Sequence, residues 1–319
     1  MASDMASVVV ATAYGGPEVL SVVERSIGVP GPDEARIIVR AAGVNPIDYK
    51  MYSGAFGADP AKLPMLLGFE VSGVVAEVGQ DAVGPVGAIK VSDEIIGYRV
   101  PGAYSSELIV PAQALVPKPA NLDWAQAAGL MLAGVTAWHC LAVTNVGPHD
   151  TVLMHGASGG VGIMAVQLAV GRGAAVIATA SPARHPFLRE LGAIPVAYGP
   201  GLAGRVRELA PGGIDASLDL VGTDEAIDVS LELVPDRARI VTIAAFGRAG
   251  QAGIKAVGGS PGADPGTEIR AAARVELAKL AAAGSLRVFV SQTFPLTAAA
   301  DAHSAISAGH TQGKIALIP

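Results

Sequence analysis

The stretch HGASGGVGIMAVQLA, residues 155–169, places four glycines within its first eight residues, directly before an apolar run. Residues 151–155 (TVLMH) before it are typical of a strand, and the apolar run predicts a helix over 160–171. The first N–H groups of a helix have no acceptor within it and carry partial positive charge. Glycines let this backbone approach an anion such as a pyrophosphate closely. The pattern therefore predicts a dinucleotide-binding turn.

The spacing Gly156-x-x-Gly159-x-x-Gly162 differs from the commoner G-x-G-x-x-G, so the alternative of a glycine turn used only for close packing stays open. The strand before, the helix after and a second strand at 174–179 favour the cofactor. In NAD-binding folds the second strand ends near an acidic residue that binds the ribose. Here Arg184 follows, and no acid comes before Glu190, so we expect NADPH rather than NADH. The alternative is that Arg184 is a solvated cation at a helix start.

The chain contains two kinds of sequence pattern. Short β-rich runs broken by Gly and Pro fill the first part, and the tail after residue 284 becomes β-like again. Between them apolar strands alternate with helical stretches, as in a parallel sheet covered on both faces. We predict an α/β protein in which a doubly wound parallel-sheet (Rossmann) domain, residues 123–267, is inserted in a β-rich domain made of residues 1–122 and 268–319. Helices are predicted at 160–171, 183–191, 201–209, 224–233 and 268–283.

Composition excludes several classes of function. The chain has 319 residues and a formal net charge of −6, without a Lys/Arg cluster, so nucleic acid is not an expected partner. Its single cysteine, Cys140, allows neither an internal disulfide nor a multi-cysteine zinc site. We find no signal-peptide pattern and no apolar run long enough for a membrane span. A cytoplasmic protein that does not engage a membrane is expected.

Six segments, taken together in this order, resemble the medium-chain dehydrogenase/reductase superfamily in its zinc-independent quinone oxidoreductase (zeta-crystallin-like) branch. They are AAGVNPIDYKMYSG (41–54), LPMLLGFEVSGVVAEVG (63–79), GAYSSELIVP (102–111), AAGLMLAGVTAWHCL (127–141), VLMHGASGGVG (152–162) and GHTQGKIALIP (309–319). The resemblance implies that the β-rich domain is GroES-like. It also implies a homodimer in which a strand near 253–257 pairs across the two-fold axis.

The resemblance further implies a set of NADPH-binding residues, matched position by position. It places Thr136 beside the nicotinamide and residues 158–161 at the pyrophosphate. Ser181, Arg184 and Tyr198 match the residues that bind the adenosine 2′-phosphate. Val221 lies where the cofactor ribose passes, residues 244–246 lie at the nicotinamide end, and Lys314 matches a family lysine near the C-terminus. In chain order these residues are Thr136, Ser158, Gly159, Gly160, Val161, Ser181, Arg184, Tyr198, Val221, Ala244, Ala245, Phe246 and Lys314.

Two departures from related enzymes bear on the chemistry. Zinc-dependent relatives have cysteine where this chain has Asn45, and histidine where it has Phe69, so only Glu70 of the catalytic ligands remains. Three protein ligands are normally needed, and we expect no metal. Enoyl-thioester reductase relatives carry a proton-donating tyrosine where this chain has Phe56, which has no hydroxyl.

The segment 45–50 supplies the candidate catalytic residues. We expect Asn45 to donate a hydrogen bond to the acceptor carbonyl, because a neutral amide stabilises developing oxyanion charge. Lys50 would add positive charge or pass a proton through water, and Asp48 would orient the loop or the ribose. Alternatives to these catalytic roles stay open. Asn45-Pro46 is also a common start of a turn, and Asp48 and Lys50 are also typical of a turn cap or a surface charge. Tyr49, Tyr52 and Phe56 are expected to line the substrate pocket.

These features predict an NADPH-dependent oxidoreductase that transfers hydride to a small-molecule quinone or activated α,β-unsaturated carbonyl without zinc. Such acceptors delocalise the charge that arrives with the hydride, and the cofactor carries the difficult chemistry. Two alternatives remain: an enoyl-thioester reductase, of the enoyl-CoA or polyketide type, and a non-catalytic NADPH-binding protein with a crystallin-like or sensory role.

Overall fold

The computed structural model describes residues 5–309 and 311–319, and the chain separates into two compact units. Unit 1 comprises Met1–Leu132, Arg274–Gly284 and Val288–Pro319, and unit 2 comprises Ala133–Ala273 and Ser285–Arg287. Unit 2 is therefore an insertion in unit 1, as predicted. Residues 1–4 of the predicted first domain lie outside the described residues.

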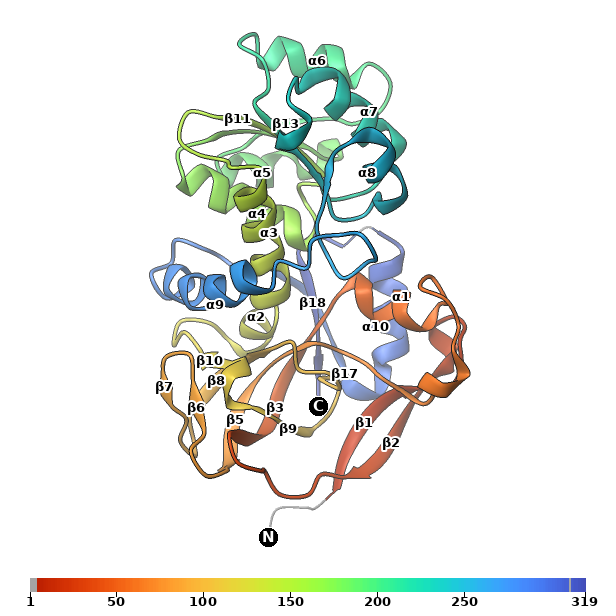
Figure 1. Ribbon diagram of the computed structural model, residues 1–319, viewed down its shortest axis with the longest axis vertical. Coiled ribbons are helices and arrows are strands. Elements are labelled where there is room, and N and C mark those ends of the chain that lie inside the picture. The colour runs from red at the N-terminus through yellow and green to blue at the C-terminus, as the bar shows by residue number, and fades with distance from the viewer. Residues whose placement is uncertain (1–4, 310) are drawn as a thin grey trace. The chain divides into compact units, whose positions relative to one another are not determined.

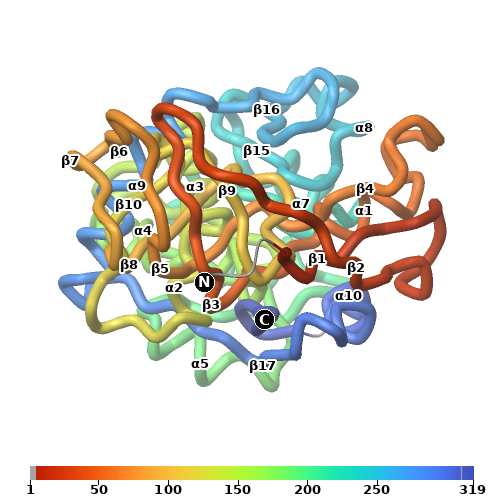
Figure 2. Tube along the Cα trace, turned by 90° about the horizontal axis from the view of Figure 1, so that it is seen from below, coloured from red at the N-terminus to blue at the C-terminus, as the bar shows by residue number. Residues whose placement is uncertain are grey.

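Unit 1 is built from sheets whose strands pair antiparallel, except for the parallel pair β17 and β18. The largest has the order β10-β8-β5-β3-β18-β17, with β9 also paired to β3, and a smaller one has the order β2-β1-β4. The hairpin partners β1 and β2 lie side by side in Figures 1 and 2. The strands are β1 (Met5–Ala11), β2 (Leu20–Ser26), β3 (Glu34–Val44), β4 (Met65–Leu66), β5 (Glu70–Val78), β6 (Val83–Gly84), β7 (Gly87–Ala88), β8 (Glu94–Tyr98), β9 (Glu107–Pro111), β10 (Leu115–Pro117), β17 (Val290–Pro295) and β18 (Lys314–Ile318).

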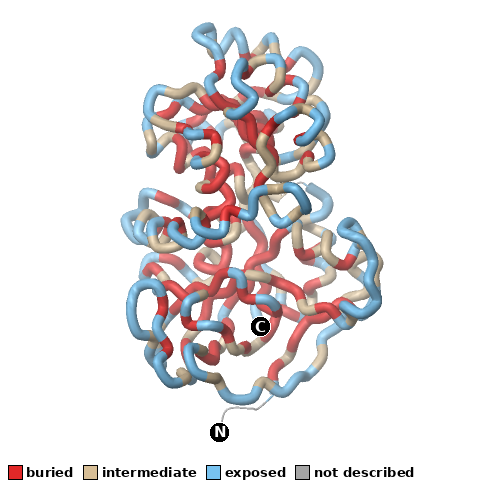
Figure 3. The backbone as a smooth tube through the Cα atoms, in the orientation of Figure 1, coloured by how far each residue is buried: buried red, intermediate tan, exposed pale blue. Residues whose placement is uncertain are grey.

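The C-terminal tail completes the main sheet of unit 1. Strand β18 pairs antiparallel with β3, placing Ile315 opposite Val44, and on its other side it pairs with β17 (Figure 1). Its residues 314–317 are buried, and Figure 3 shows buried backbone along this strand. The expectation that the β-like tail belongs to the first domain is confirmed.

Unit 1 also contains three helices that lie wholly within it. They are α1 (Pro46–Tyr52), α2 (Trp124–Ala128) and α10 (Ala299–Ser307), and α10 packs beside α1 (Figure 1). The N-cap of α2 is Asp123, whose carboxylate accepts from the backbone N–H of Gln126 at 2.8 Å. Asn121, two residues earlier, donates from Nδ2 to the Ala281 carbonyl at 2.9 Å.

Unit 2 contains a six-stranded parallel sheet in the order β13-β12-β11-β14-β15-β16. The strand order reverses between β11 and β14, which is where doubly wound sheets bind ligands. The strands are β11 (Thr151–His155), β12 (Ala175–Thr179), β13 (Ile194–Val196), β14 (Ala216–Asp219), β15 (Ile240–Thr242) and β16 (Lys255–Ala256). The helices are α4 (Gly160–Gly171), α5 (His185–Glu190), α6 (Leu202–Leu209), α7 (Asp224–Leu233) and α8 (Phe246–Ala252), while α3 (Met131–Val143) and α9 (Thr267–Ala282) span the sequence boundaries between the units.

The boundaries between the units fall later in the chain than we predicted. Helix α2 was assigned to the inserted domain, yet its Ala128 is buried with Ala41 of β3 and Ala316 of β18. Ser72 of β5 also donates its hydroxyl proton to the Trp124 carbonyl at 2.6 Å. Burial of a small apolar face on the β-rich sheet thus places this helix in unit 1. Within the part of the chain that the structure describes, no helix is both long and apolar enough to cross a bilayer.

Candidate functional site

The glycine turn after β11 has two positions that only glycine can occupy. Gly156 has φ +73°, a conformation that side chains disfavour. A Cβ on Gly162 would lie 2.5 Å from the Gly156 carbonyl oxygen, so α4 can pack against the turn only without a side chain there. These two glycines are explained by the fold itself.

Gly159 is different. It caps α4 with φ −78°, and a Cβ built on it would meet only the Gly156 carbonyl oxygen, at an ordinary 3.5 Å. Packing within the chain therefore does not require glycine at this position. The side-chain-free backbone leaves space in front of the N–H groups of Gly160 and Val161, which have no acceptor within the helix. This surface fits a pyrophosphate group.

The other predicted cofactor residues of unit 2 follow the carboxyl ends of neighbouring parallel strands. Such ends lie along one edge of a sheet, so the structure brings these residues to the same edge as the glycine turn. Arg184 lies in a short 3-10 helix (Pro182–Arg184) that begins after its N-cap, Ser181. Tyr198 follows β13 and Val221 follows β14, and both side chains are exposed. Thr136 is buried on α3.

A buried carboxylate connects the two loops that carry Val221 and Ala244–Ala245. One oxygen of Asp219 accepts from the backbone N–H groups of Val221 and Gly222, at 3.1 and 2.7 Å. The other accepts the hydroxyl proton of Thr242 at 2.6 Å. Thr242 Oγ1 in turn accepts from the N–H groups of Ala244 and Ala245. Asp219 and Thr242 were not among the predicted site residues, although each ends a strand of the series.

The predicted catalytic loop lies in unit 1, where Asn45 caps α1 and is buried. Its Nδ2 donates to Glu70 Oε1 at 3.0 Å and to the Gly43 carbonyl at 3.3 Å. Its Oδ1 accepts from Lys314 Nζ. Lysine only donates and the carboxylate only accepts, so the amide orientation is fixed. Both N–H donors of Asn45 are engaged, and the oxyanion role we expected would require this network to open.

Lys314, at the start of β18, lies in unit 1 and is buried. Its ammonium group donates to Glu70 Oε1 at 2.9 Å, to the Val44 carbonyl at 3.2 Å and to Asn45 Oδ1. These three acceptors account for all three of its N–H groups. The lysine therefore has no donor left for a cofactor, in contrast to the role that the resemblance implies, and acts as the counter-ion of Glu70.

Asp48, another predicted catalytic residue, is a buried carboxyl group in the first turn of α1. Its Oδ2 accepts from the Asn45 backbone N–H and from the Tyr104 hydroxyl, each at 2.8 Å. Burial raises the pKa of Asp48 to about 7, although these hydrogen bonds and Lys314 act in the opposite direction. Its Oδ1 is buried and has no hydrogen-bond partner among the described residues.

A chain of buried aromatic and imidazole groups continues from Asp48. The Tyr104 hydroxyl is 3.1 Å from His303 Nε2, and His303 Nδ1 is 2.8 Å from the Tyr52 hydroxyl. Burial lowers the pKa of His303 to about 4, so its ring is neutral near pH 7. Neither His303 nor Tyr104 was among the predicted site residues. Only the fold brings α10, α1 and the loop before β9 together, so local patterns carried no signal.

The remaining residues predicted for the pocket have different environments. Tyr52 is buried with its hydroxyl bonded to His303, so it is not an open pocket wall. Tyr49 is half-buried against the core of unit 1, and Lys50 is half-buried on α1. Phe56 is exposed.

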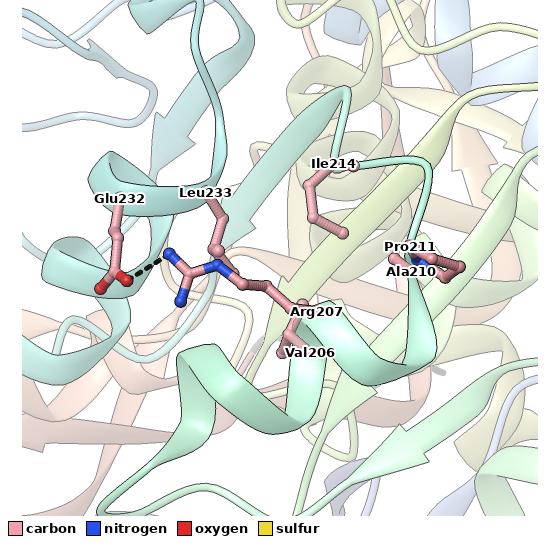
Figure 4. A pocket seen from close by; sticks show the side chains of 8 residues that line it. Val206, Arg207, Ala210, Pro211, Ile214, Glu232 and Leu233 are labelled. Carbon is pink, nitrogen blue, oxygen red and sulfur yellow. Dashed lines mark hydrogen bonds and ion pairs between the residues drawn. The ribbon is translucent and has the colours of Figure 1, made fainter.

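A separate recess in unit 2 lies between the end of α6 and the end of α7 (Figure 4). Val206, Ala210, Ile214 and Leu233 form its apolar part, and Arg207 is tied to Glu232 across it at 2.5 Å (Figure 4). None of the predicted site residues lines this recess, so we do not assign the chemistry to it.

Comparisons with known proteins cover nearly the whole chain. Residues 31–120 match the family described as alcohol dehydrogenase GroES-like domain, and residues 191–317 match zinc-binding dehydrogenase. A quinone oxidoreductase of Pseudomonas aeruginosa is 35% identical, over 96% of this chain and 98% of that protein. A 2-haloacrylate reductase of Burkholderia sp is 35% identical, over 96% of each. The structure of Escherichia coli quinone oxidoreductase complexed with NADPH is 31% identical, with a TM-score of 0.84 over 98% of this chain and 100% of that one.

The buried carboxyl of Asp48 leads to a prediction about stability and pH. Its pKa is raised from 3.8 to about 7 in the folded chain, so folding favours the protonated form. Stability from this group is full below the unfolded pKa and is lost as pH rises towards 7. Asp48→Asn removes this titration. The variant's melting temperature relative to wild type should therefore rise between pH 5 and pH 8, by the equivalent of roughly 2 kcal/mol.

Asp123→Asn, at the exposed cap of α2, serves as the control and should give a constant difference over this range. A constant difference for Asp48→Asn as well would show that burial does not raise the pKa of this carboxyl.

Proposed function

The chain belongs to the quinone oxidoreductase branch of the medium-chain dehydrogenase/reductase superfamily, and on this premise we propose that it reduces quinones or activated α,β-unsaturated carbonyl compounds with NADPH. The observation that carries the proposal is the turn at Gly159, whose missing side chain is not explained by packing. It lies beside the point where the strand order of the parallel sheet reverses, between β11 and β14. A pyrophosphate held there accounts for the glycine.

The residues of unit 2 would bind and orient the cofactor. The N–H groups at the start of α4 hold the pyrophosphate, and Arg184 provides a cation for the 2′-phosphate. The Asp219–Thr242 connection fixes the loops at Val221 and at Ala244–Ala245 against each other, and so holds the backbone that faces the nicotinamide half. When bound, NADPH supplies a hydride.

We also propose that the reaction uses no zinc, because the donor set does not fit the metal. Phe69 offers no ligand atom, and Asn45 and Glu70 both bind the Lys314 ammonium. A divalent cation would have to displace this buried positive charge. Among residues 5–309 and 311–319 no group of three His, Cys, Asp or Glu side chains could hold a metal ion.

A homodimer is part of the proposal. Strand β16 lies at one end of the six-stranded sheet, next to β15. An edge strand of this kind offers backbone groups for pairing with a second copy.

The purified protein should oxidise NADPH when given 1,2-naphthoquinone, 9,10-phenanthrenequinone or a simple enone. The measurement is loss of NADPH absorbance, with crotonyl-CoA as a third class of acceptor. Activity with crotonyl-CoA alone would support a thioester reductase instead. Tight NADPH binding without turnover of any acceptor would support a non-catalytic role.

The glycine turn offers a matched pair of variants. Gly159→Ala adds a methyl group where the chain has room, so stability should change by no more than about 1 kcal/mol while NADPH affinity falls at least tenfold. Gly162→Ala places the same methyl against the turn and should lower the melting temperature markedly. Fluorescence titration and thermal unfolding measure the two effects. Unchanged NADPH affinity in Gly159→Ala would argue against a pyrophosphate at the turn.

Replacing Arg184 tests the choice of cofactor. Arg184→Ala should weaken NADPH by one to two orders of magnitude while leaving NADH little changed, because only NADPH carries the 2′-phosphate. Calorimetric titration with both cofactors measures this, and Arg189→Ala on α5 is the control. Equal weakening of both cofactors would contradict a 2′-phosphate contact.

A further inference from the structure

We propose that Tyr52, His303, Tyr104 and Asp48 form a relay that supplies the proton consumed when the acceptor is reduced, with Oδ1 of Asp48 as its donor atom. The inference rests on the proposed function and identifies the proton source that hydride transfer leaves open. It depends on the continuity, direction and burial of one hydrogen-bonded chain within unit 1.

The chain is continuous over four groups. Tyr52 Oη lies 2.8 Å from His303 Nδ1, His303 Nε2 lies 3.1 Å from Tyr104 Oη, and Tyr104 donates to Asp48 Oδ2 at 2.8 Å. The Tyr52 and His303 rings are also stacked, with centroids 5.6 Å apart. The ring of His303 is thereby held between two hydroxyl groups.

The chain has a direction when Asp48 is ionised. The carboxylate only accepts, so the Tyr104 proton points at it, and the Tyr104 oxygen is left to accept from His303 Nε2–H. In the neutral ring Nδ1 is then the acceptor of the Tyr52 proton. Every donor therefore points towards Asp48, which is the order needed to carry a proton to it.

The far oxygen of Asp48 identifies the delivery atom. Oδ2 already accepts two hydrogen bonds, from Asn45 N–H and the Tyr104 hydroxyl. Among the residues that the structure describes, Oδ1 is buried without a hydrogen-bond partner, which is unfavourable for a buried polar atom. A proton on Oδ1, or a bound molecule that meets it, removes this cost. Oδ1 is thus the atom suited to hold and release a proton.

The surrounding charges keep the relay functional near neutral pH. Asp48 on α1 feels Lys314 from β18, which favours ionisation, and Glu70 from β5, which opposes it. Tyr104 from the loop before β9 is its hydrogen-bond partner, and α10 contributes His303 behind Tyr104. Burial outweighs the others and brings the pKa of Asp48 to about 7.

The outer end of the relay is Tyr52, on the same helix as Asp48. The charge of the exposed Glu18 acts on this hydroxyl, and Tyr49 acts on it from within α1. Tyr52 is buried like the other three groups, and as the last group of the chain it is the point at which a proton would enter.

Reduction of one enone consumes one hydride and one proton. An enone takes a hydride at its β-carbon and becomes an enolate, which takes the proton from Asp48 Oδ1 as that O–H bond breaks. Asp48 then accepts at Oδ2 the Tyr104 proton, Tyr104 accepts from His303 Nε2, and His303 Nδ1 accepts from Tyr52. One solvent proton restores Tyr52. A half-turn of the Asp48 carboxyl group brings its new O–H to the Oδ1 position, and the Tyr104 hydroxyl turns back towards Asp48. The imidazole returns to its starting tautomer by losing the proton at Nδ1 and gaining one at Nε2. The net reaction consumes NADPH, the enone and one proton.

His303→Gln, Tyr104→Phe and Tyr52→Phe interrupt the relay at three points. With an enone, each should lower kcat by about 100-fold, the scale of general acid catalysis, while NADPH affinity is unchanged. With 9,10-phenanthrenequinone the loss should be much smaller, because the reduced quinone is a weaker base than an enolate. In mixtures of H2O and D2O the wild-type rate should follow a curved proton inventory, and the variants a linear one.

Tyr14→Phe is the matched control, because this half-buried tyrosine loses the same atom and its hydroxyl bonds only to the backbone of Asp59 among the contacts described for it. It should keep the curved inventory and the wild-type ratio of enone to quinone turnover. Both readouts are ratios within one variant, so partial misfolding does not change them.

Enone turnover within twofold of wild type in His303→Gln and Tyr104→Phe would overturn the relay. So would equal losses with both acceptors and an unchanged inventory, because that is the result of a structural role. A wild-type protein inactive with every acceptor overturns the proposed function itself and is recognised before any variant is made.

Discussion

The ion pair between Lys314 and Glu70 is the interaction on which unit 1 depends. Both groups are buried, and their nitrogen and oxygen atoms lie 2.9 Å apart. Removing one partner of such a pair typically costs about 3–5 kcal/mol, because the other charge is left unpaired away from water. Here every donor of the ammonium group is used, and Glu70 also accepts from Asn45 and from the Leu132 N–H at 2.7 Å. Four segments of the chain therefore meet at one pair of charges.

This arrangement links the polar groups around Glu70 to the fold. A lysine bound to the amide at 45 and the carboxylate at 70 gives a fixed positive charge to positions whose counterparts in zinc-dependent relatives serve the metal. The same network holds the backbone N–H that Asp48 accepts from, and so fixes the start of α1. The proposed catalytic residues are thus also structural ones, whereas Phe56 is exposed.

The periodic parts of the fold could be predicted from sequence, and the long-range polar contacts could not. Helices at 160–171 and 224–233 were predicted with the bounds the structure gives, because glycine turns and caps mark them. The predicted start of the inserted domain differs from that of unit 2 because α2 is short and its burial on the main sheet leaves no local pattern. For the candidate site, the glycine turn could be located from the strand before it and the helix after it. The Tyr104–His303 contact joins residues 199 positions apart, and no sequence pattern reports such a distance.

The glycines of this turn belong to one sequence pattern, but they are required for different reasons. Gly156 and Gly162 are fixed by backbone conformation and helix packing, while Gly159 is not. A pattern of glycines therefore cannot by itself distinguish a ligand site from a tight turn. The space that a Cβ would occupy makes that distinction.

Strand β18 is synthesised long after β3, the strand with which it pairs. This strand lies between β3 and β17 within the main sheet, yet it is translated about 270 residues after its partner β3. All of unit 2 emerges from the ribosome before β18 does. The nascent chain therefore carries a finished Rossmann domain attached to an incomplete sheet, whose open edge must be kept from pairing with other chains until the last strand arrives.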